Sequence, residues 1–386
     1  MARLSRPEHR RPAGFTLIEL LVVIVIIGLL AALLVPAISG AVRQARDAQV
    51  TAEMTILSQA IASFNTKYAS YPVSRMLVRE DLSPDQWLGA LGSDSANTLA
   101  NNSLTWYGQN PSLYSTTSDV TLATLVQRST GVLRKMFPKM GTPNNTFWHD
   151  FNGDNVRQTG WILLEGHECL AFFLGGVPQR TGSTFGMTGF SKNPVFPFMP
   201  DLGGGPGRTT PFFEFKADRL ADDDDGDGVP GYLDPRNSGT DARFYAYFSA
   251  TGQGGYDPND MNMGGGRAFS SPEEVWGRFT RTNLGLLTPE WSIGPNPYTT
   301  SDAVPLNNRP AVYINPNSFQ LISAGVDAIY GPGGQFTPDS TTSRLPIDTF
   351  ITQGPNPFPP TATPDPSARK SERDNLSNFS QSRLDP

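Results

Sequence analysis

The stretch GFTLIELLVVIVIIGLLAALLVPAI, at residues 14–38, decides the architecture of this 386-residue chain. From Phe15 to Ile38 it contains 24 residues, enough to cross a hydrocarbon layer of about 30 Å as a helix. Its one charged residue is Glu19. A carboxylate inside an apolar span costs at least ~2.5–3.5 kcal/mol, so we expect Glu19 to have a partner and a function.

The residues before the apolar stretch carry four arginines and one glutamate. This excess of positive charge predicts a cytoplasmic N-terminus and a chain that continues outside the membrane. A conventional signal peptide is the competing interpretation, with its small-residue cleavage site after the apolar run. Here a helical pattern continues past Ser39 and Gly40, and the small residue Gly14 precedes the run instead. A plain signal anchor, the other alternative, would not need Glu19.

The motif GFTLIE at residues 14–19, with Pro36 near the end of the apolar run, resembles the class III signal of type IV pilins and type II secretion pseudopilins. The resemblance implies that a prepilin peptidase cleaves between Gly14 and Phe15 and that the new Phe15 amine is N-methylated. It also implies that apolar helices bundle in a filament, where Glu19 neutralises the Phe15 amine of a neighbouring subunit. Because an unpaired buried charge costs roughly 3–5 kcal/mol, this pair would set the register between subunits.

A helical period of apolar residues continues beyond Pro36. The stripe recurs at intervals of three and four residues, as one helix face requires, and consists of Val50, Met54, Leu57, Ile61, Phe64 and Tyr68. The pattern predicts one helix from Phe15 to about Ser70 that ends before Pro72, with Pro36 as a point of kinking or local melting. The stripe is interpreted as the face that packs on a globular head, with a coiled-coil seam as the alternative.

The sequence therefore predicts an α+β fold, in which a long N-terminal transmembrane helix packs on a head with an antiparallel β-sheet and loop-rich insertions, as in pilins. The expected segments are a cleaved cytoplasmic leader (1–14), the transmembrane half of the helix (15–38), its periplasmic half (39–71), a periplasmic head (72–350) and a Pro-rich C-terminal arm (351–386).

Within the head, composition predicts a helix around residues 120–140 and a short apolar element over 161–174. Runs of aromatic and β-branched residues bounded by Gly, Pro and Asn predict strands at residues 211–216, 244–250, 311–314 and 319–323.

The segment ADDDDGDGVPGYLDP, at residues 221–235, has the ligand spacing of an EF-hand-type calcium loop, with Asp in place of the terminal Glu. Gly228 permits the sharp turn of such a loop. The predicted Ca²⁺ ligands are the carboxylates of Asp223, Asp225, Asp227 and Asp234 and the backbone carbonyl of Val229. The alternative is a solvated acidic loop, although four consecutive aspartates repel one another and favour a counter-cation.

Two other polar stretches are interpreted as structural. DFNGDN at residues 150–155 lacks an acid at the twelfth position, which is Trp161, so an Asx-rich turn is favoured over a metal loop. HECLA has Ala171 where a zinc-protease motif requires a second histidine. A helix packed under the head with an exposed His167 is therefore expected, with Cys169 as a small apolar residue.

The segment FQLISAGVDAIYGPGG, at residues 319–334, resembles the C-terminal strand and loop of major pseudopilins, which has the pattern Ser-x-Gly-x-Asp-Gly. Ser323, Gly325 and Asp327 match this pattern. Ala328 replaces the last glycine and the downstream acids are missing, so no metal site is predicted at Asp327. Since the chain has one cysteine, Cys169, it lacks the disulfide that the resemblance implies for pilus-forming pilins, which favours the pseudopilin branch.

The formal net charge is −6, and −9 without the leader, so no nucleic-acid partner is expected. The resemblance implies a single-pass protein of the bacterial inner membrane that is not an enzyme but a structural subunit of a periplasmic type II secretion filament for protein export. Its implied partners are the prepilin peptidase, copies of itself, other pseudopilins, and the inner-membrane assembly platform with its ATPase. The alternatives are a type IV pilin for adhesion, motility or DNA uptake, and a membrane-anchored calcium-dependent binding or hydrolytic ectodomain.

Overall fold

The computed structural model describes residues 16–98, 106–107, 122–182, 184–199, 207–222, 227–235, 243–250, 255–257, 260–261, 276–281, 287–292, 296–301, 312–331, 333–340, 343–345, 369–380 and 382–385. The chain divides into two compact units, Met1–Gln49 and Val50–Pro386. We call the second unit the head and describe each unit by itself.

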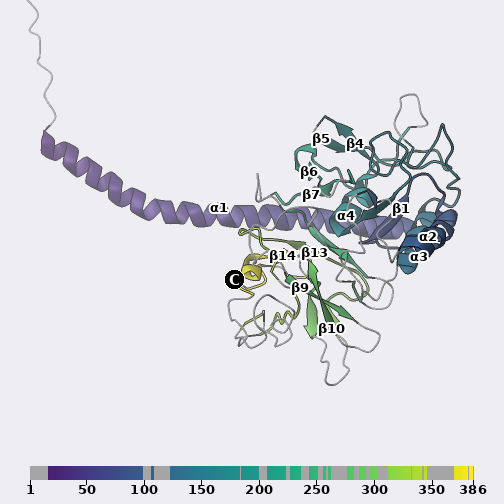
Figure 1. Cartoon of the computed structure of the whole chain (residues 1–386). Coiled ribbons are helices and arrows are strands. Elements are labelled where there is room, and N and C mark those ends of the chain that lie inside the picture. The colour runs from purple at the N-terminus through teal and green to yellow at the C-terminus, as the bar shows by residue number, and fades with distance from the viewer. Residues whose placement is uncertain are drawn as a thin grey trace, which may run out of the picture. The chain divides into compact units, whose positions relative to one another are not determined.

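One long helix, α1 (Leu17–Tyr68), begins in the first unit and ends in the head, as Figure 1 shows. Its 52 residues continue through Pro36 without interruption. The helix ends at Tyr68 because Ala69 takes a left-handed conformation, with φ of 50°, and Pro72 follows shortly. The predicted helix from Phe15 to about Ser70 is thus confirmed over its described residues.

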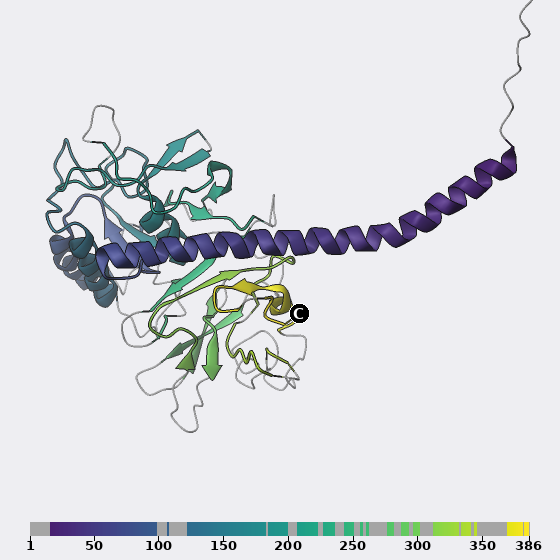
Figure 2. The ribbon, with the colours of Figure 1, turned by 180° about the vertical axis from the view of Figure 1, so that it is seen from behind.

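The apolar stripe of α1 packs in the core of the head. Val50, Met54, Leu57, Ile61 and Phe64 are at most 3% exposed, and Tyr68 is half-buried against the same core. In Figures 1 and 2 this part of α1 runs between β4–β7 on one side and β8, β13 and β14 on the other. The stripe is therefore the face against which the head folds, and not a coiled-coil seam.

A first sheet of three strands has the order β1-β3-β2. In it β3 (Trp161–Leu164) pairs antiparallel with β1 (Met76–Arg79) and parallel with β2 (Trp106–Tyr107). The helices of this part of the head are α2 (Pro84–Thr98), α3 (Leu122–Met136) and α4 (Gly166–Gly175). The helix predicted around residues 120–140 is therefore confirmed as α3, and the apolar element predicted at 161–174 is a strand followed by a helix.

A second sheet has the order β14-β13-β8, and both of its pairings are antiparallel. It consists of β8 (Ala246–Ser249), β13 (Phe319–Ser323) and β14 (Leu376–Ser377). Alternate residues of the sheet face two different cores. Tyr247 and Leu321 lie in the core that contains α1, whereas Phe248 and Ile322 lie in a second core. Because both faces are buried, apolar residues of β8 and β13 do not alternate strictly with polar ones along the sequence.

Four two-stranded ribbons complete the described strands. They are β4 (Pro178–Thr181) with β5 (Thr184–Met187), β6 (Leu220–Ala221) with β7 (Gly231–Tyr232), β9 (Trp276–Arg281) with β10 (Leu287–Ser292), and β11 (Thr299–Ser301) with β12 (Val312–Tyr313). Short 3₁₀ turns lie at η2 (Ala217–Arg219) and η7 (Ser371–Asp374). The long apolar helix and these small, mostly antiparallel sheets confirm the predicted α+β class.

The C-terminal segment differs from the expected arm. Residues 369–385 belong to the head, because β14 extends the second sheet and Leu384 is fully buried in the second core. Arg369 and Glu372 form a buried ion pair at 2.6 Å. The prolines at residues 355–366 suggested an extended arm, but they end before this segment begins.

The strand predicted at residues 211–216 is also wrong. The backbone bends at Phe212 and Phe213, and both N–H groups donate to the Leu174 carbonyl, at 2.8 and 3.3 Å. The aromatic rings pack on other parts of the head, with Phe212 against Phe64 and Phe215 against Tyr232. The run is aromatic because its rings pack against the core that contains the α1 stripe, not because it joins a sheet.

Candidate functional site

A capping box closes the start of α1, and Glu19 is its acidic member. Its Oε2 accepts hydrogen bonds from the Thr16 backbone N–H at 2.9 Å and from the Thr16 hydroxyl at 2.7 Å. The Glu19 N–H donates in turn to the Thr16 hydroxyl oxygen at 3.3 Å. Such reciprocal bonds satisfy donors that a helix N-terminus leaves open. Gly14 and Phe15 lie outside the described residues, so the processing site and its amine stay predictions.

The N-terminal part of α1 presents large aliphatic side chains all around its surface. Between Leu17 and Ile38 these side chains are 44–86% exposed. Among the helices that the structure describes, α1 alone is long and apolar enough to cross a membrane, with a mean hydropathy of 3.2 over its best window. A helix that is apolar on every side suits lipid or the centre of a bundle. This segment is compatible with anchoring in the inner membrane.

Where α1 enters the head, Glu53 is held by an arrangement that we call the Glu53 clamp, formed with Arg219, Tyr232 and Tyr245. Arg219 donates from Nη1 and Nη2 to the two carboxylate oxygens at 2.7 and 2.9 Å. The tyrosine hydroxyls donate to the same oxygens, Tyr232 at 3.0 Å and Tyr245 at 2.9 Å. The guanidinium also lies over the Tyr232 ring, 4.2 Å from its centroid.

Burial raises the pKa of both clamp tyrosines, so each keeps its proton and remains a donor at neutral pH. The Glu53 carboxylate therefore receives four hydrogen bonds from side chains of the head. Charged, bidentate bonds of this kind are stronger than neutral ones and fix orientation as well. The clamp locks the axial position and rotation of α1 within the head.

The predicted calcium loop is only partly described, since Asp223 and Asp225 lie outside the described residues. Asp227 Oδ1 accepts the Val229 N–H at 2.7 Å, and Gly228 has the expected positive φ of 80°. The buried carboxylate of Asp234 accepts a hydrogen bond from the Ser323 hydroxyl through Oδ2. One oxygen of the twelfth position is thus already engaged. In the described part of the chain, no group of three His, Cys, Asp or Glu side chains is arranged to hold a metal ion.

The DFNGDN stretch forms the predicted Asx-rich turn. Asp150 Oδ1 accepts the Gly153 N–H at 2.8 Å, and Asp154 Oδ1 accepts the Val156 N–H at 2.7 Å. This turn also touches the acidic loop, because Asn152 Nδ2 donates to the Asp227 carbonyl at 2.9 Å. Two Asp-rich segments about 75 residues apart therefore lie side by side, a contact that spacing rules do not predict.

Beneath this turn lies Glu80, a fully buried acid that sequence analysis did not single out. It accepts the N–H groups of Phe151 and Gln158 at 2.9 and 3.0 Å. Burial and repulsion from Asp150 raise the pKa of Glu80 to about 9, and burial raises the pKa of Asp150 to about 7. At neutral pH this acidic turn therefore holds bound protons.

In the loop after β13, Ala328 occupies the position where the pseudopilin pattern has a glycine. Ala328 adopts a positive φ of 61°, a conformation that glycine takes without steric cost. Asp327 Oδ1 accepts the Ile329 N–H at 2.9 Å. Asp374, from the C-terminal segment, accepts the N–H groups of Val326 and Asp327 through Oδ2. The structure thus brings a distant acid to this loop.

His167 and Cys169 are both fully buried in α4. The histidine was expected to be exposed, and this was wrong: all of α4 is enclosed, and the His167 ring lies 4.7 Å from the Phe244 ring. Ala171 occupies the place of the second histidine of a zinc-protease motif. Cys169 packs as a small apolar residue, as predicted, and burial raises the pKa of its thiol.

Comparison with known proteins agrees with the geometry of α1. Residues 9–35 match the family model of the prokaryotic N-terminal methylation motif, so the chain carries a type IV pilin or pseudopilin signal. It is 36% identical over 67 residues to type II secretion system core protein G of Aeromonas hydrophila, and 35% identical over 65 residues to the protein of the same name from Pseudomonas aeruginosa. No solved structure matches the chain.

The similarity has a defined extent. It covers 17% of this chain in both cases, and 47% and 46% of the two relatives. The chain thus spans about half the length of the curated relatives that it matches. The N-terminal region is therefore pseudopilin-like. The similarity to these relatives covers 17% of the chain, so the rest of the head is characterised from its structure alone.

Proposed function

We propose that this chain is a pseudopilin-like structural subunit of a type II secretion system. Its leader is removed after Gly14, the Phe15 amine is methylated, and the mature subunit joins a periplasmic filament that serves protein export. The observation that carries the proposal is the methylation motif at residues 9–35, combined with a helix that begins two residues after the predicted cleavage site and is apolar and exposed along its N-terminal part.

Glu19 has the assembly role in this proposal. In the single chain its carboxylate bonds to Thr16 within the capping box. In a filament the Phe15 amine of a neighbouring subunit competes for the same carboxylate, and a charge pair in an apolar bundle is stronger than an exposed hydrogen bond. Glu19 then changes partner on assembly, from a hydroxyl of its own helix to an amine of the next subunit.

The partners follow from the same proposal. They are a prepilin peptidase with N-methylase activity, copies of this chain, other pseudopilins, and an inner-membrane platform with its ATPase. The subunit is anchored in the inner membrane by α1, with the head in the periplasm. Its role is structural and not catalytic, and Ca²⁺ bound by Asp223, Asp225, Asp227, Val229 and Asp234 would stabilise the acidic loop of the head.

The deciding experiment is the intact mass of the N-terminal peptide from purified membranes. A peptide that starts at N-methylated Phe15 supports the proposal. A peptide that retains residues 1–14 contradicts it and identifies a plain membrane anchor. Immunolabelling of sheared surface fibres then separates a periplasmic secretion filament, which leaves no label, from a type IV pilus, which is labelled along its length.

A further inference from the structure

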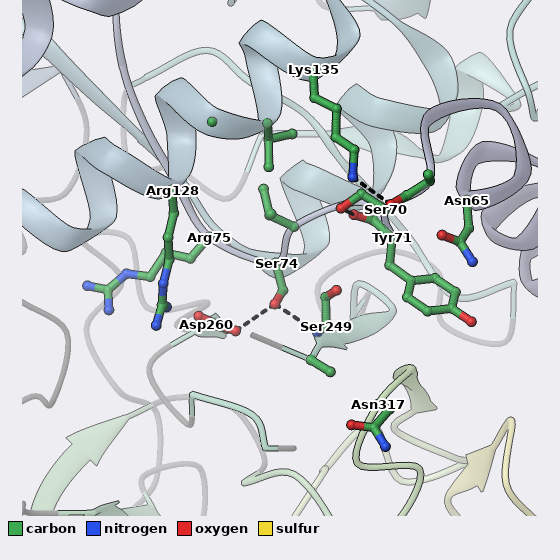
Figure 3. Close-up of a pocket in the computed structure, with 15 residues that line it drawn as sticks. Asn65, Ser70, Tyr71, Ser74, Arg75, Arg128, Lys135, Ser249, Asp260 and Asn317 are labelled. Atoms are coloured by element: carbon green, nitrogen blue, oxygen red, sulfur yellow. Dashed lines mark hydrogen bonds between the residues drawn. The ribbon is translucent and has the colours of Figure 1, made fainter. Parts of the chain in front are cut away.

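The head contains a cavity of about 580 Å³ at the point where α1 ends, shown in Figure 3. Its wall is formed by the C-terminal end of α1, one face of α3 and the end of β8. This volume lies within the range of small-ligand sites, roughly 300–1,000 Å³. No residue of the cavity takes part in the capping box, the Glu53 clamp or the acidic loop.

Two arginines, Arg75 and Arg128, line one end of the cavity. In Figure 3 their side chains lie next to each other on the side of the cavity where Asp260 lies. Arg75 is only 8% exposed, and its buried Nε and Nη1 form no hydrogen bond with any described residue. Its charged neighbour, Asp257, is 3.9 Å away, beyond hydrogen-bond distance. A buried guanidinium with unmade hydrogen bonds is costly, so Arg75 has donors that a ligand in the cavity can satisfy.

Asp260 does not supply that acceptor. It is 2% exposed, and its Oδ2 accepts the Ser74 hydroxyl at 2.5 Å. Ser74 is itself fixed, because its oxygen accepts the Ser249 N–H at 2.8 Å. The pKa of Asp260 is raised to about 7 by burial and by the neighbouring Asp257. At neutral pH the two arginines therefore exceed the negative charge of Asp257 and Asp260.

A second wall, next to the arginines, is a face of α3 on which Arg128, Gly131 and Lys135 are aligned. A Cβ built at Gly131 would meet no atom within 4 Å, so this mid-helix glycine borders open space. Lys135 is already engaged, since its Nζ donates to the Ala69 carbonyl at 2.6 Å and closes the end of α1. The cavity thus has a positive end at the arginines and a bare helical wall beside it.

We propose that this cavity binds a carboxylate, held by Arg75 and Arg128, with the rest of the ligand lying along α3 at Gly131. Guanidinium groups bind planar carboxylates through paired hydrogen bonds. A monoanion suits the site better than a dianionic phosphate, because Asp257 and Asp260 lie beside the arginines. Two sources share this chemistry, a small organic acid and the C-terminal carboxylate of a peptide.

The test uses the full chain in detergent micelles and two matched probes, N-acetylphenylalanine and N-acetylphenylalaninamide, titrated by calorimetry. The acid should bind at least about ten-fold more tightly than the amide, since only the acid can pair with the arginines. An acetylated tripeptide that ends in phenylalanine separates the two sources. If the tripeptide binds more tightly than N-acetylphenylalanine, the natural ligand is a peptide C-terminus. If the two bind equally, the natural ligand is a small organic acid.

Arg128→Gln is the main variant, because Arg128 is half-buried and forms no hydrogen bond or ion pair in the described part of the chain. It should weaken binding of the acid by about ten-fold with an unchanged melting temperature. Gly131→Leu should block the wall and abolish binding, whereas Gly131→Ala is the control that keeps it. Equal affinity for acid and amide, no binding of the acid, tighter binding of inorganic phosphate, or an unaffected Arg128→Gln would each overturn the proposal.

Discussion

Arg219 binds the carboxylate of Glu53 through both terminal nitrogens, at 2.7 and 2.9 Å, and thereby joins α1 to a turn of the head 166 residues further along the chain. Both side chains are almost buried, with 13% of Glu53 and 12% of Arg219 exposed. The pair is thus well shielded from water, and the two tyrosine hydroxyls complete the hydrogen bonding of the carboxylate.

We expect Glu53→Ala to lower the free energy of unfolding of the head by roughly 3 kcal/mol, because it leaves the Arg219 guanidinium without its counter-charge. Urea unfolding of the full chain in detergent measures this change. Gln59→Ala, at an exposed site of the same helix, is the matched control and should change stability by less than about 0.5 kcal/mol. Equal effects of the two substitutions would show that the clamp adds nothing.

Glu19→Ala should be inserted and processed normally but should not enter filaments, because the Phe15 amine would then be buried without a partner. Crosslinking and shearing of membranes, followed by immunoblotting, measure assembly. Thr16→Ala separates two roles of Glu19, since it removes the partner within the capping box and keeps the carboxylate. If Thr16→Ala loses filament assembly to the same extent as Glu19→Ala, the role of Glu19 is to cap its own helix.

Gly14→Val should leave an uncleaved precursor in the membrane, because the peptidase of the proposed family requires a small residue before the cleaved bond. The mobility and mass of the N-terminal peptide report this directly. Gly40→Val, on the exposed surface of α1, is the matched control and should be processed like the wild type. Normal maturation of Gly14→Val would remove the processing site from Gly14.

Calcium bound by the acidic loop should raise the melting temperature of the head, and a chelator should lower it, because a ligand that binds only the folded state stabilises that state. Differential scanning calorimetry with EGTA and then with excess Ca²⁺ measures both shifts. Asp225→Asn should abolish the response, while Asp218→Asn, an exposed acid just outside the loop, should retain it. A melt that EGTA leaves unchanged would support a solvated acidic loop.

The stability of the head should fall as pH rises from about 5 to 9. The pKa of Glu80 is raised from 4.5 to about 9 in the folded protein, so between these values the folded state binds a proton that the unfolded state releases. The slope from one such group is at most ~1.4 kcal/mol per pH unit. Urea unfolding between pH 5 and 9 measures it, and Glu80→Gln should flatten it.

The stability of Glu80→Gln at pH 5 provides a control for this measurement. Glu80 accepts two backbone N–H groups and a glutamine side chain has one acceptor oxygen, so Glu80→Gln should be about 1 kcal/mol less stable than the wild type at pH 5. Any slope that remains near pH 7 belongs to Asp150 and Asp260, whose pKa values are both raised to about 7. An unaltered slope in Glu80→Gln would show that Glu80 is not the titrating group.

The parts of this fold that were predictable are those that a local pattern determines. The stripe from Val50 to Phe64 follows helical spacing, and β13 is a short run that contains Phe319, Leu321 and Ile322 and is followed closely by a glycine. The stretch 211–216 has the same local composition as a strand, but its aromatic rings pack against the core from an irregular segment, which composition alone does not reveal.

The side-chain sites were predictable only where their members are close in sequence. The Thr16–Glu19 box and the Asx turn at residues 150–155 each span a few residues. By contrast, the hydroxyl partners of Glu53 lie 179 and 192 residues away, and Glu53 is merely one polar residue beside an apolar stripe. The placement of Arg75 and Arg128 in one cavity likewise depends on how α3 packs in the head. Neither residue belongs to a sequence motif.

The burial of Leu384 and the pairing of β14 with β13 have a consequence for synthesis of the protein on the ribosome. The second sheet, which shares a core with the α1 stripe, lacks one edge until Leu376 has been made. At ~5–20 residues per second, the interval between synthesis of Phe64 and of Leu376 is about 15–60 s. During that time the apolar face of a finished helix has no completed core to enter.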